Sequence, residues 1–271
     1  MKKSVLKVLA MLLVLVMVIG SIPVSAAKTV ETDSKKGVND AIGGKKAATV
    51  VLATDAEGTI VIHSQDGAES NKKLVIDAPN ANIVNYGSFK AINIAACKSY
   101  KEKGVDNVIY VKDSKAKLTI CKDVEVGKIV VQTKKATLNF NDGSNGIVVA
   151  KKAKGKLTIN ASEDTVIGVQ LAKKTTLTVN GDEDALVGVE NDAEGSKIVA
   201  STTVYIEANQ SCDVNLKEGA EGSLVDAAND AVDVNLKNES ETVIIVTIGG
   251  EIPSNIPDNA STAAISVEGV N

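Results

Sequence analysis

Two pairs of adjacent carboxylates, Glu163-Asp164 and Glu183-Asp184, stand twenty residues apart in this chain. On neighbouring turns of a coil they would lie about 5 Å apart, close to the acid–nucleophile separation of a retaining glycosidase. Their oxygens would also suit a weak calcium site. The third interpretation, which we favour because no sharper motif surrounds them, is a repeated turn whose acids face solvent. These four residues are the candidates for catalysis.

The composition narrows the chemistry that the chain can perform. Arginine and tryptophan are absent and only 2% of residues are aromatic, so guanidinium forks are excluded and sugar-stacking platforms are scarce. His63 is the only histidine, and any triad or Cys/His metal site would need it. It ends the apolar stretch TIVIH, where we interpret it as an ordinary strand residue. We expect no cofactor and no metal.

The three cysteines are Cys97, Cys121 and Cys212. A disulfide scaffold shows a dense and even set, which this is not. We favour free thiols that act as small apolar side chains. The alternative is a Cys97–Cys121 bridge.

The carboxylate pairs belong to a longer repeat with a period near twenty residues. One series of similar segments is spaced by 20, 19 and 20 residues, at Leu118, Leu138, Leu157 and Leu177. A second apolar series runs between them, at Ile129, Ile147, Ile167 and Val187. A fixed period across most of a chain is typical of a repeat architecture.

Each repeat contains two short alternating strand signals separated by turn formers such as Asn141-Asp142-Gly143 and Gly181-Asp182. A parallel connection needs about a dozen residues, and no repeat has room for a crossover helix. Each strand must therefore pair with its counterpart one turn later. The sequence predicts an all-β, single-domain parallel β-solenoid (β-helix) of about ten turns.

Alternation within the strands assigns side chains to columns. The predicted core contains Leu118/Ile120, Leu138/Phe140, Leu157/Ile159 and Leu177/Val179. The next position predicts a structural ladder that supports each bend, made of Cys121, Asn141, Asn160 and Asn180.

Threonines occupy the position between the two core residues of several strands. Thr119, Thr158 and Thr178 are predicted to share a column that Asn139 interrupts. A regular column of threonines could form a flat ice-binding face. We interpret these threonines as ordinary strand formers.

The first 26 residues have the parts of a secretory signal. Lys2, Lys3 and Lys7 precede the uncharged stretch 8–20, and small residues at Val24-Ser25-Ala26 suit cleavage. The uncharged stretch is shorter than the ~20 residues that span a bilayer. We therefore favour cleavage over an uncleaved anchor, and expect a secreted or extracellular bacterial protein, whether released or associated with the cell wall.

The remaining chain divides into three parts. We expect an N-terminal segment at 27–47, the parallel β-helix at 48–250, and a cap or flexible tail at 251–271. Apolar residues at helical spacing in KGVNDAIGG, followed by Gly43-Gly44, predict a short helix over 36–44 that covers the first turn.

The helix signal VNDAI, the strand signal TVVLA and the asparagine column together resemble the pectin-lyase-like right-handed parallel β-helices, over residues 36–250. The resemblance implies a right-handed coil that usually has three sheets, whereas the sequence shows two strand signals per turn. Enzymes of this superfamily cleave polysaccharides with clustered carboxylates, aided in the lyases by calcium and a basic residue. Their usual arginine has no candidate here.

Charge and uniform turns favour a structural, adhesive or glycan-binding role over catalysis by Asp164 and Asp184. The net charge is −4, and it becomes more negative once the leader's lysines are removed, so we expect no nucleic-acid partner. Lysine pairs recur near every twenty residues, at Lys134-Lys135, Lys151-Lys152 and Lys173-Lys174. They form either a solvated edge or a ridge for anionic wall polysaccharide. Membrane contact is expected through the leader alone.

Overall fold

The computed structural model describes residues 29–44, 47–64, 69–113, 115–152, 154–229, 231–240 and 245–248. Within these ranges the chain forms one helix and twenty strands. They are β1 (Thr29–Thr32), α2 (Lys35–Gly43), β2 (Thr49–Ala53), β3 (Gly58–Ile62), β4 (Lys73–Asn85), β5 (Ala91–Glu102), β6 (Val108–Val111), β7 (Lys117–Ile120), β8 (Glu125–Val131), β9 (Lys135–Phe140), β10 (Asn145–Ala150), β11 (Gly155–Ala161), β12 (Val166–Leu171), β13 (Thr175–Gly181), β14 (Leu186–Asn191), β15 (Ser196–Ser201), β16 (Val204–Ala208), β17 (Cys212–Leu216), β18 (Leu224–Ala227), β19 (Val234–Asn238) and β20 (Ile245–Ile248).

The strands form two parallel ladders, one on each face of a coil. Ladder A contains β1, β2, the first parts of β4 and β5, and the even-numbered strands from β6 to β20. Ladder B contains β3, the later parts of β4 and β5, and the odd-numbered strands from β7 to β19. Strands β4 and β5 are long because each continues around the bend from one ladder to the other.

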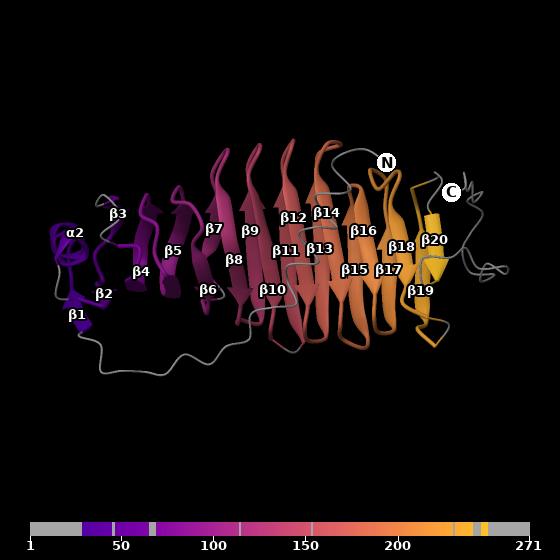
Figure 1. Ribbon diagram of the computed structural model, residues 1–271, viewed down its shortest axis with the longest axis horizontal. Coiled ribbons are helices and arrows are strands. Elements are labelled where there is room, and N and C mark those ends of the chain that lie inside the picture. The colour runs from indigo at the N-terminus through magenta and orange to yellow at the C-terminus, as the bar shows by residue number, and fades with distance from the viewer. Residues whose placement is uncertain are drawn as a thin grey trace.

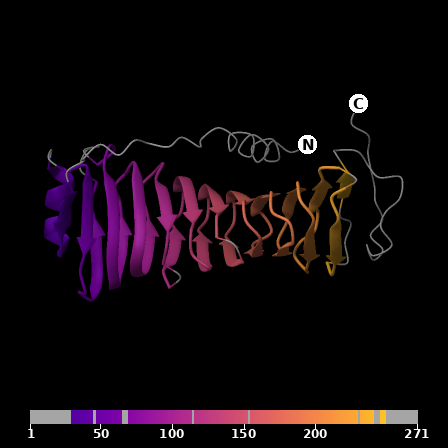
Figure 2. The same ribbon diagram turned by 90° about the horizontal axis from the view of Figure 1, so that it is seen from below.

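Successive turns stack into a rod with α2 at one end and β20 at the other (Figures 1 and 2). The predicted all-β parallel β-solenoid of about ten turns is confirmed. In the described part each turn contributes two strands, as the sequence signals indicated. The pectin-lyase-like β-helices that the sequence resembles usually have three strands per turn, one in each of three sheets.

The core lies between the two ladders and is made of stacked aliphatic columns. The predicted inward positions are confirmed: each is at most 2% exposed, namely Leu118, Ile120, Leu138, Phe140, Leu157, Ile159, Leu177 and Val179. A single turn could not bury these side chains by itself, because they are covered by the equivalent side chains of the turns before and after it. Stacking therefore supplies most of the burial that stabilises the fold.

The register differs from the predicted one between β9 and β11. Leu138 pairs with Ile159, and Leu157 pairs with Ala136, so β11 is shifted by two residues from the predicted alignment of Leu138 with Leu157. A shift of two leaves every side chain on the same face of the sheet. The apolar–polar alternation therefore fits both registers, and only the stacking of the turns shows which one forms.

The helix lies over the first turns, where Val38 and Ile42 are fully buried against the core. The Ser34 hydroxyl accepts a hydrogen bond from the Gly37 amide and so caps its N-terminus. Strand β1 pairs with β2, so the parallel ladder begins before the helix and not at residue 48 as expected, because the helix is inserted within the first turn.

The predicted leader at 1–26 and the predicted cap or tail at 251–271 lie outside the described residues. In the ranges that are described, no helix has both the length and the apolar character needed to cross a bilayer.

Candidate functional site: a polar groove on ladder B

The four candidate carboxylates lie on two stacked surface turns. Residues 161–166 and 181–186 have equal length and are held by aligned strands on both sides, so the turns superpose. All four side chains are exposed. Asp164 has a φ of 56°, in the left-handed region that a tight turn requires and that Asp tolerates. Among the described residues, no group of three or more acidic, cysteine or histidine side chains is placed to hold a metal ion.

A ladder of asparagine amides runs up ladder B, with a different membership from the predicted one. Asn160 pairs with Asn139 on one side and with Asn180 on the other. Cys121 and Asn141 do not belong to it. They lie two residues after the ladder positions Thr119 and Asn139, in the bends that follow β7 and β9. The adjoining positions of the same column are Thr119 and Ser201.

Hydrogen bonds join these amides directly. Asn160 Nδ2 donates to Asn139 Oδ1 at 2.7 Å, and Asn180 Nδ2 donates to Asn160 Oδ1 at 2.9 Å. An amide has two N–H donors and two acceptor lone pairs on oxygen. Asn160 uses one N–H to donate to Asn139 and one lone pair to accept from Asn180. Asn160 therefore keeps one N–H and one lone pair that the ladder does not use.

A threonine column lies beside the asparagine ladder. Thr137, Thr158 and Thr178 occupy aligned positions on three consecutive strands. This corrects the predicted threonine column, since Thr119 aligns with Asn139 and lies in the amide column. The reason is again the register between β9 and β11.

The amide column forms part of a shallow groove of about 580 Å³ that crosses five strands. Its lining includes Thr119, Asn139, Asn160, Asn180, Ser201 and the turn residue Asp182. At the ~4.8 Å spacing of neighbouring strands, five polar side chains span about 19 Å. The groove thus offers a nearly uncharged, regularly spaced row of hydrogen-bonding groups.

Three carboxylates also stack on the outer face of ladder A. Glu190, Glu207 and Asp226 occupy one column on successive strands. Burial, then the charges of Asp192 and Glu207, raise the pKa of Glu190 to about 7. Burial, then the charges of Asp226 and Asp192, raise the pKa of Glu207. The groove on ladder B does not include these acids.

Sequence reasoning missed this acidic column because its members are separated by 17 and 19 residues and escape a period of twenty. The signal that could have found them is their similar position: each acid is the next-to-last residue of an even-numbered strand, in the segments VGVE, VYIE and LVDA.

A buried carboxyl lies at an inward position in the early turns. Glu102 is fully buried, and its Oε2 accepts from the Tyr100 hydroxyl at 2.7 Å. Its Oε1 accepts from Asn85 Nδ2 at 2.8 Å and from the Gly104 amide at 2.7 Å. Burial raises the pKa of Glu102 to about 7, against these three donors, which lower it. Burial, then the charge of Glu102, raise the pKa of Tyr100.

All three cysteines are free, so the Cys97–Cys121 bridge is excluded. Cys97 and Cys212 are buried as expected, while Cys121 is half-buried. His63 follows β3 and its ring stacks on Tyr86 with 6.5 Å between centroids. It has no described acid or cysteine cluster around it.

No protein-family model matches the chain. No curated protein and no solved structure matches it either.

Proposed function

We propose that the protein is an exported, non-catalytic β-solenoid that binds an extended polysaccharide along the groove of ladder B. The observation that carries the proposal is the hydrogen-bonded row Asn139–Asn160–Asn180, whose members repeat once per strand. Because the row is rigid and regular, a ligand with a matching repeat can make the same contact several times.

A polysaccharide has the chemistry that suits this groove. Each sugar unit carries hydroxyls that both donate and accept, and an extended polymer can present such units repeatedly to side chains spaced by the ~4.8 Å of neighbouring strands. The side chains of Thr158 and Thr178 add hydroxyls beside the amides. Few charged groups line the groove, which favours an uncharged polymer.

The leader at 1–26 supports an extracellular or cell-wall location, where such polymers occur. The resemblance to pectin-lyase-like β-helices supports the ligand class, because enzymes of that superfamily act on polysaccharides. We propose that this chain shares the coiled architecture of those enzymes but not their catalytic activity, since it has two strands per turn and not three.

The test measures binding of the mature chain to neutral polysaccharides on a glycan array, followed by titration of the best ligand. The double variant Thr178→Ala/Asn180→Ala should weaken binding by about tenfold, since it removes two hydrogen-bonding groups. The matched control Thr49→Ala/Asn93→Ala removes the same groups from the outer face of ladder A and should bind as the unmodified protein does. Equal affinity in both variants, or no neutral ligand at all, would contradict the proposal.

Catalysis is the second candidate, as a calcium-assisted lyase or a glycoside hydrolase acting through the stacked turns. Their alignment and exposure keep Asp164 and Asp184 within reach of a polymer. Release of reducing sugar from polyuronides, with and without Ca²⁺, measures this activity. Turnover that disappears in Asp164→Ala/Asp184→Ala would make the protein an enzyme and overturn the non-catalytic assignment.

A further inference from the structure

We infer that one edge of the rod binds a linear polyanion that carries phosphate or carboxylate groups. This edge, called the basic edge, lies where ladder A strands turn into ladder B strands. Its lysines come from three consecutive turns and the strand starts beside them: Lys134, Lys135, Lys151, Lys152, Lys154, Lys156, Lys173 and Lys174. The inference goes beyond the neutral groove, since it concerns another surface and another class of ligand.

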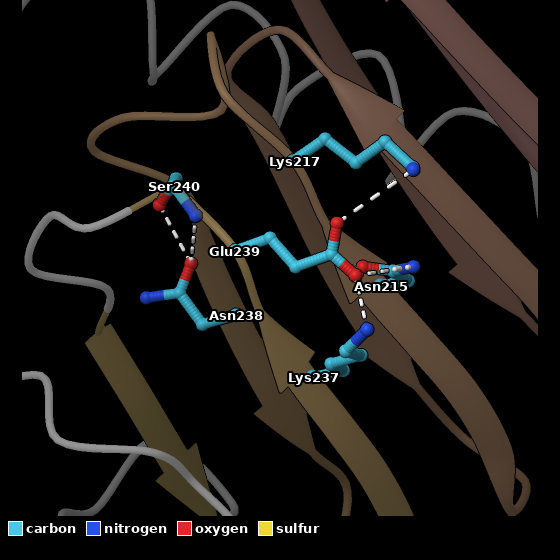
Figure 3. A network of polar contacts seen from close by, with 6 residues as sticks. All are labelled: Asn215, Lys217, Lys237, Asn238, Glu239 and Ser240. Carbon is cyan, nitrogen blue, oxygen red and sulfur yellow. Dashed lines mark hydrogen bonds and ion pairs between the residues drawn. The ribbon is translucent and has the colours of Figure 1, made fainter.

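The lysines of the basic edge have no acidic partner in the described part of the chain. The ion pairs found there are Lys122–Asp142, Lys217–Glu239 and Lys237–Glu239. Figure 3 shows how lysines are neutralised elsewhere on the rod, where Glu239 lies between Lys217 and Lys237. Among the described residues, no such pairing occurs at the basic edge, although acidic residues outnumber lysines in the whole chain.

The lysines also approach one another. Lys135 and Lys156 are direct partners on neighbouring strands. The Lys154 amide donates to the Lys174 carbonyl at 2.7 Å, which holds those two residues on adjacent turns. Like charges directly opposite one another destabilise a sheet. An anion bound between them would relieve this repulsion.

A small hollow lies among three of these lysines. It has a volume of about 140 Å³ and is lined by Lys154, Lys156, Lys174, Thr175 and Gly195. A Cβ at Gly195 would stand 2.7 Å from Lys174 Nζ, so glycine leaves the space that the ammonium group occupies. The hollow thus brings three cationic side chains around a space suited to one anionic group.

The periodicity of the edge indicates a polymer and not a single small anion. Successive turns of the solenoid are ~4.8 Å apart along the rod, so a polymer that lies along the basic edge contacts further lysines at each of its three turns. The row of lysines ends at the next turn of the solenoid, where the bend between β14 and β15 carries Glu194. A ligand is therefore expected to place its charges on the turns before that residue.

The test measures the anisotropy of two end-labelled probes, poly(glycerol phosphate) and polygalacturonate, with labelled dextran as the uncharged comparison. Both anionic probes should bind the mature chain, with affinity that falls as salt rises, and the stronger of the two identifies phosphate or carboxylate as the preferred group. Lys154→Gln/Lys156→Gln/Lys174→Gln should weaken binding by about tenfold.

A charge-matched control separates the edge from overall charge. Lys36→Gln/Lys90→Gln/Lys101→Gln removes three exposed lysines that lie away from the basic edge. This control should retain most of the affinity. Equal losses in both triple variants, or binding that ignores salt, would overturn the inference.

Two further outcomes are decisive. The exposed acids on the opposite edge could instead attract the basic edge of a second copy. Sedimentation at low salt that shows self-association abolished by the first triple variant, with no polyanion binding, would overturn the inference. Unchanged polyanion binding by Thr178→Ala/Asn180→Ala would support it, and it would show that failure of the neutral groove is a separate result.

Discussion

The side-chain amide of Asn160 donates a hydrogen bond to Asn139 Oδ1 across 2.7 Å, although 21 residues separate the two in the chain. The bond links β9 to β11, where partner residues are 21 apart and the predicted alignment fails. Asn180 extends the same row by donating to Asn160 Oδ1. Asn160 therefore belongs to both the register of the sheet and the surface of the groove.

Replacing Asn160 by Ala should destabilise the protein by about 1–2 kcal/mol, because it leaves Asn139 and Asn180 each without one partner. Asn141→Ala is the matched control, since Asn141 is exposed and stands outside the ladder. It should change the free energy of unfolding by less than about 0.5 kcal/mol. Urea unfolding of the two variants measures the difference. A larger loss in the Asn141 variant would mean that the register is wrong.

The buried Glu102 should make the stability of the protein fall as pH rises. The folded-state pKa, about 7, lies above the ordinary value of 4.5, so between these values the folded state binds a proton that the unfolded state has lost. The contribution of Glu102 is fully present below about pH 4.5 and is lost by about pH 7. The expected loss is roughly 3 kcal/mol.

Glu102→Gln should remove that part of the pH dependence, because the amide does not titrate. Denaturant unfolding at several pH values between 4.5 and 8 compares the two proteins. Glu163→Gln, on an exposed turn, is the control and should keep the original slope. Glu190 and Glu207 also have raised pKa values, so the difference between variants and not the absolute slope is diagnostic.

The space around two glycines predicts that their substitution by alanine affects stability to different degrees. A Cβ at Gly104 would overlap the Gly87 carbonyl oxygen of the preceding turn and stand 2.8 Å from Asn107 Nδ2. Gly104→Ala should therefore destabilise by about 1–3 kcal/mol. At Gly168 the nearest atom is Ile147 Cγ1 at 3.9 Å, so Gly168→Ala should stay within about 0.5 kcal/mol. Thermal unfolding tests both, and similar midpoints would refute the prediction.

The three free thiols should differ in reactivity. Burial, then the charge of Asp113, raise the pKa of Cys97 to about 12, and burial, then the charge of Asp213, raise that of Cys212 to about 11. Because the thiolate is the reactive form, both should resist iodoacetamide in the native protein. Half-buried Cys121 should be alkylated first.

Mass spectrometry of native and denatured protein, both without reductant, measures this order. Denaturation should expose all three thiols to label. Only one labelled thiol in the denatured, unreduced protein would reveal a disulfide and contradict the free state of the cysteines.

The fold class was predictable because its signals are local. Alternation along a strand shows which side chains turn inward, and the twenty-residue period shows that strands recur without a helix between them. Leu118, Leu138 and Leu177 were assigned to the core on that basis, and each is fully buried. The helix over Lys35–Gly43 was similarly visible from its apolar spacing and its glycine stop.

The columns that face outward were harder to predict, because each depends on the lengths of several bends. A register shift of two residues keeps Leu157 and Ile159 inward, so nothing in the strand itself reports it. The ladder was accordingly assigned to Cys121 and Asn141, when its true member is Asn139. The same reason hid the carboxylates of Glu190 and Glu207, whose separation departs from the period.

The sequence by itself determined that this chain coils into a parallel β-solenoid with an aliphatic core, because the burial of apolar side chains depends on alternation alone. Only the tertiary structure decided which polar side chains meet across turns. Hydrogen bonds such as Asn160–Asn139, and the pairing of Lys135 with Lys156 on neighbouring strands, depend on alignment to within one residue. Alignment between turns is set by how each bend closes, and that is a property of the stacked coil.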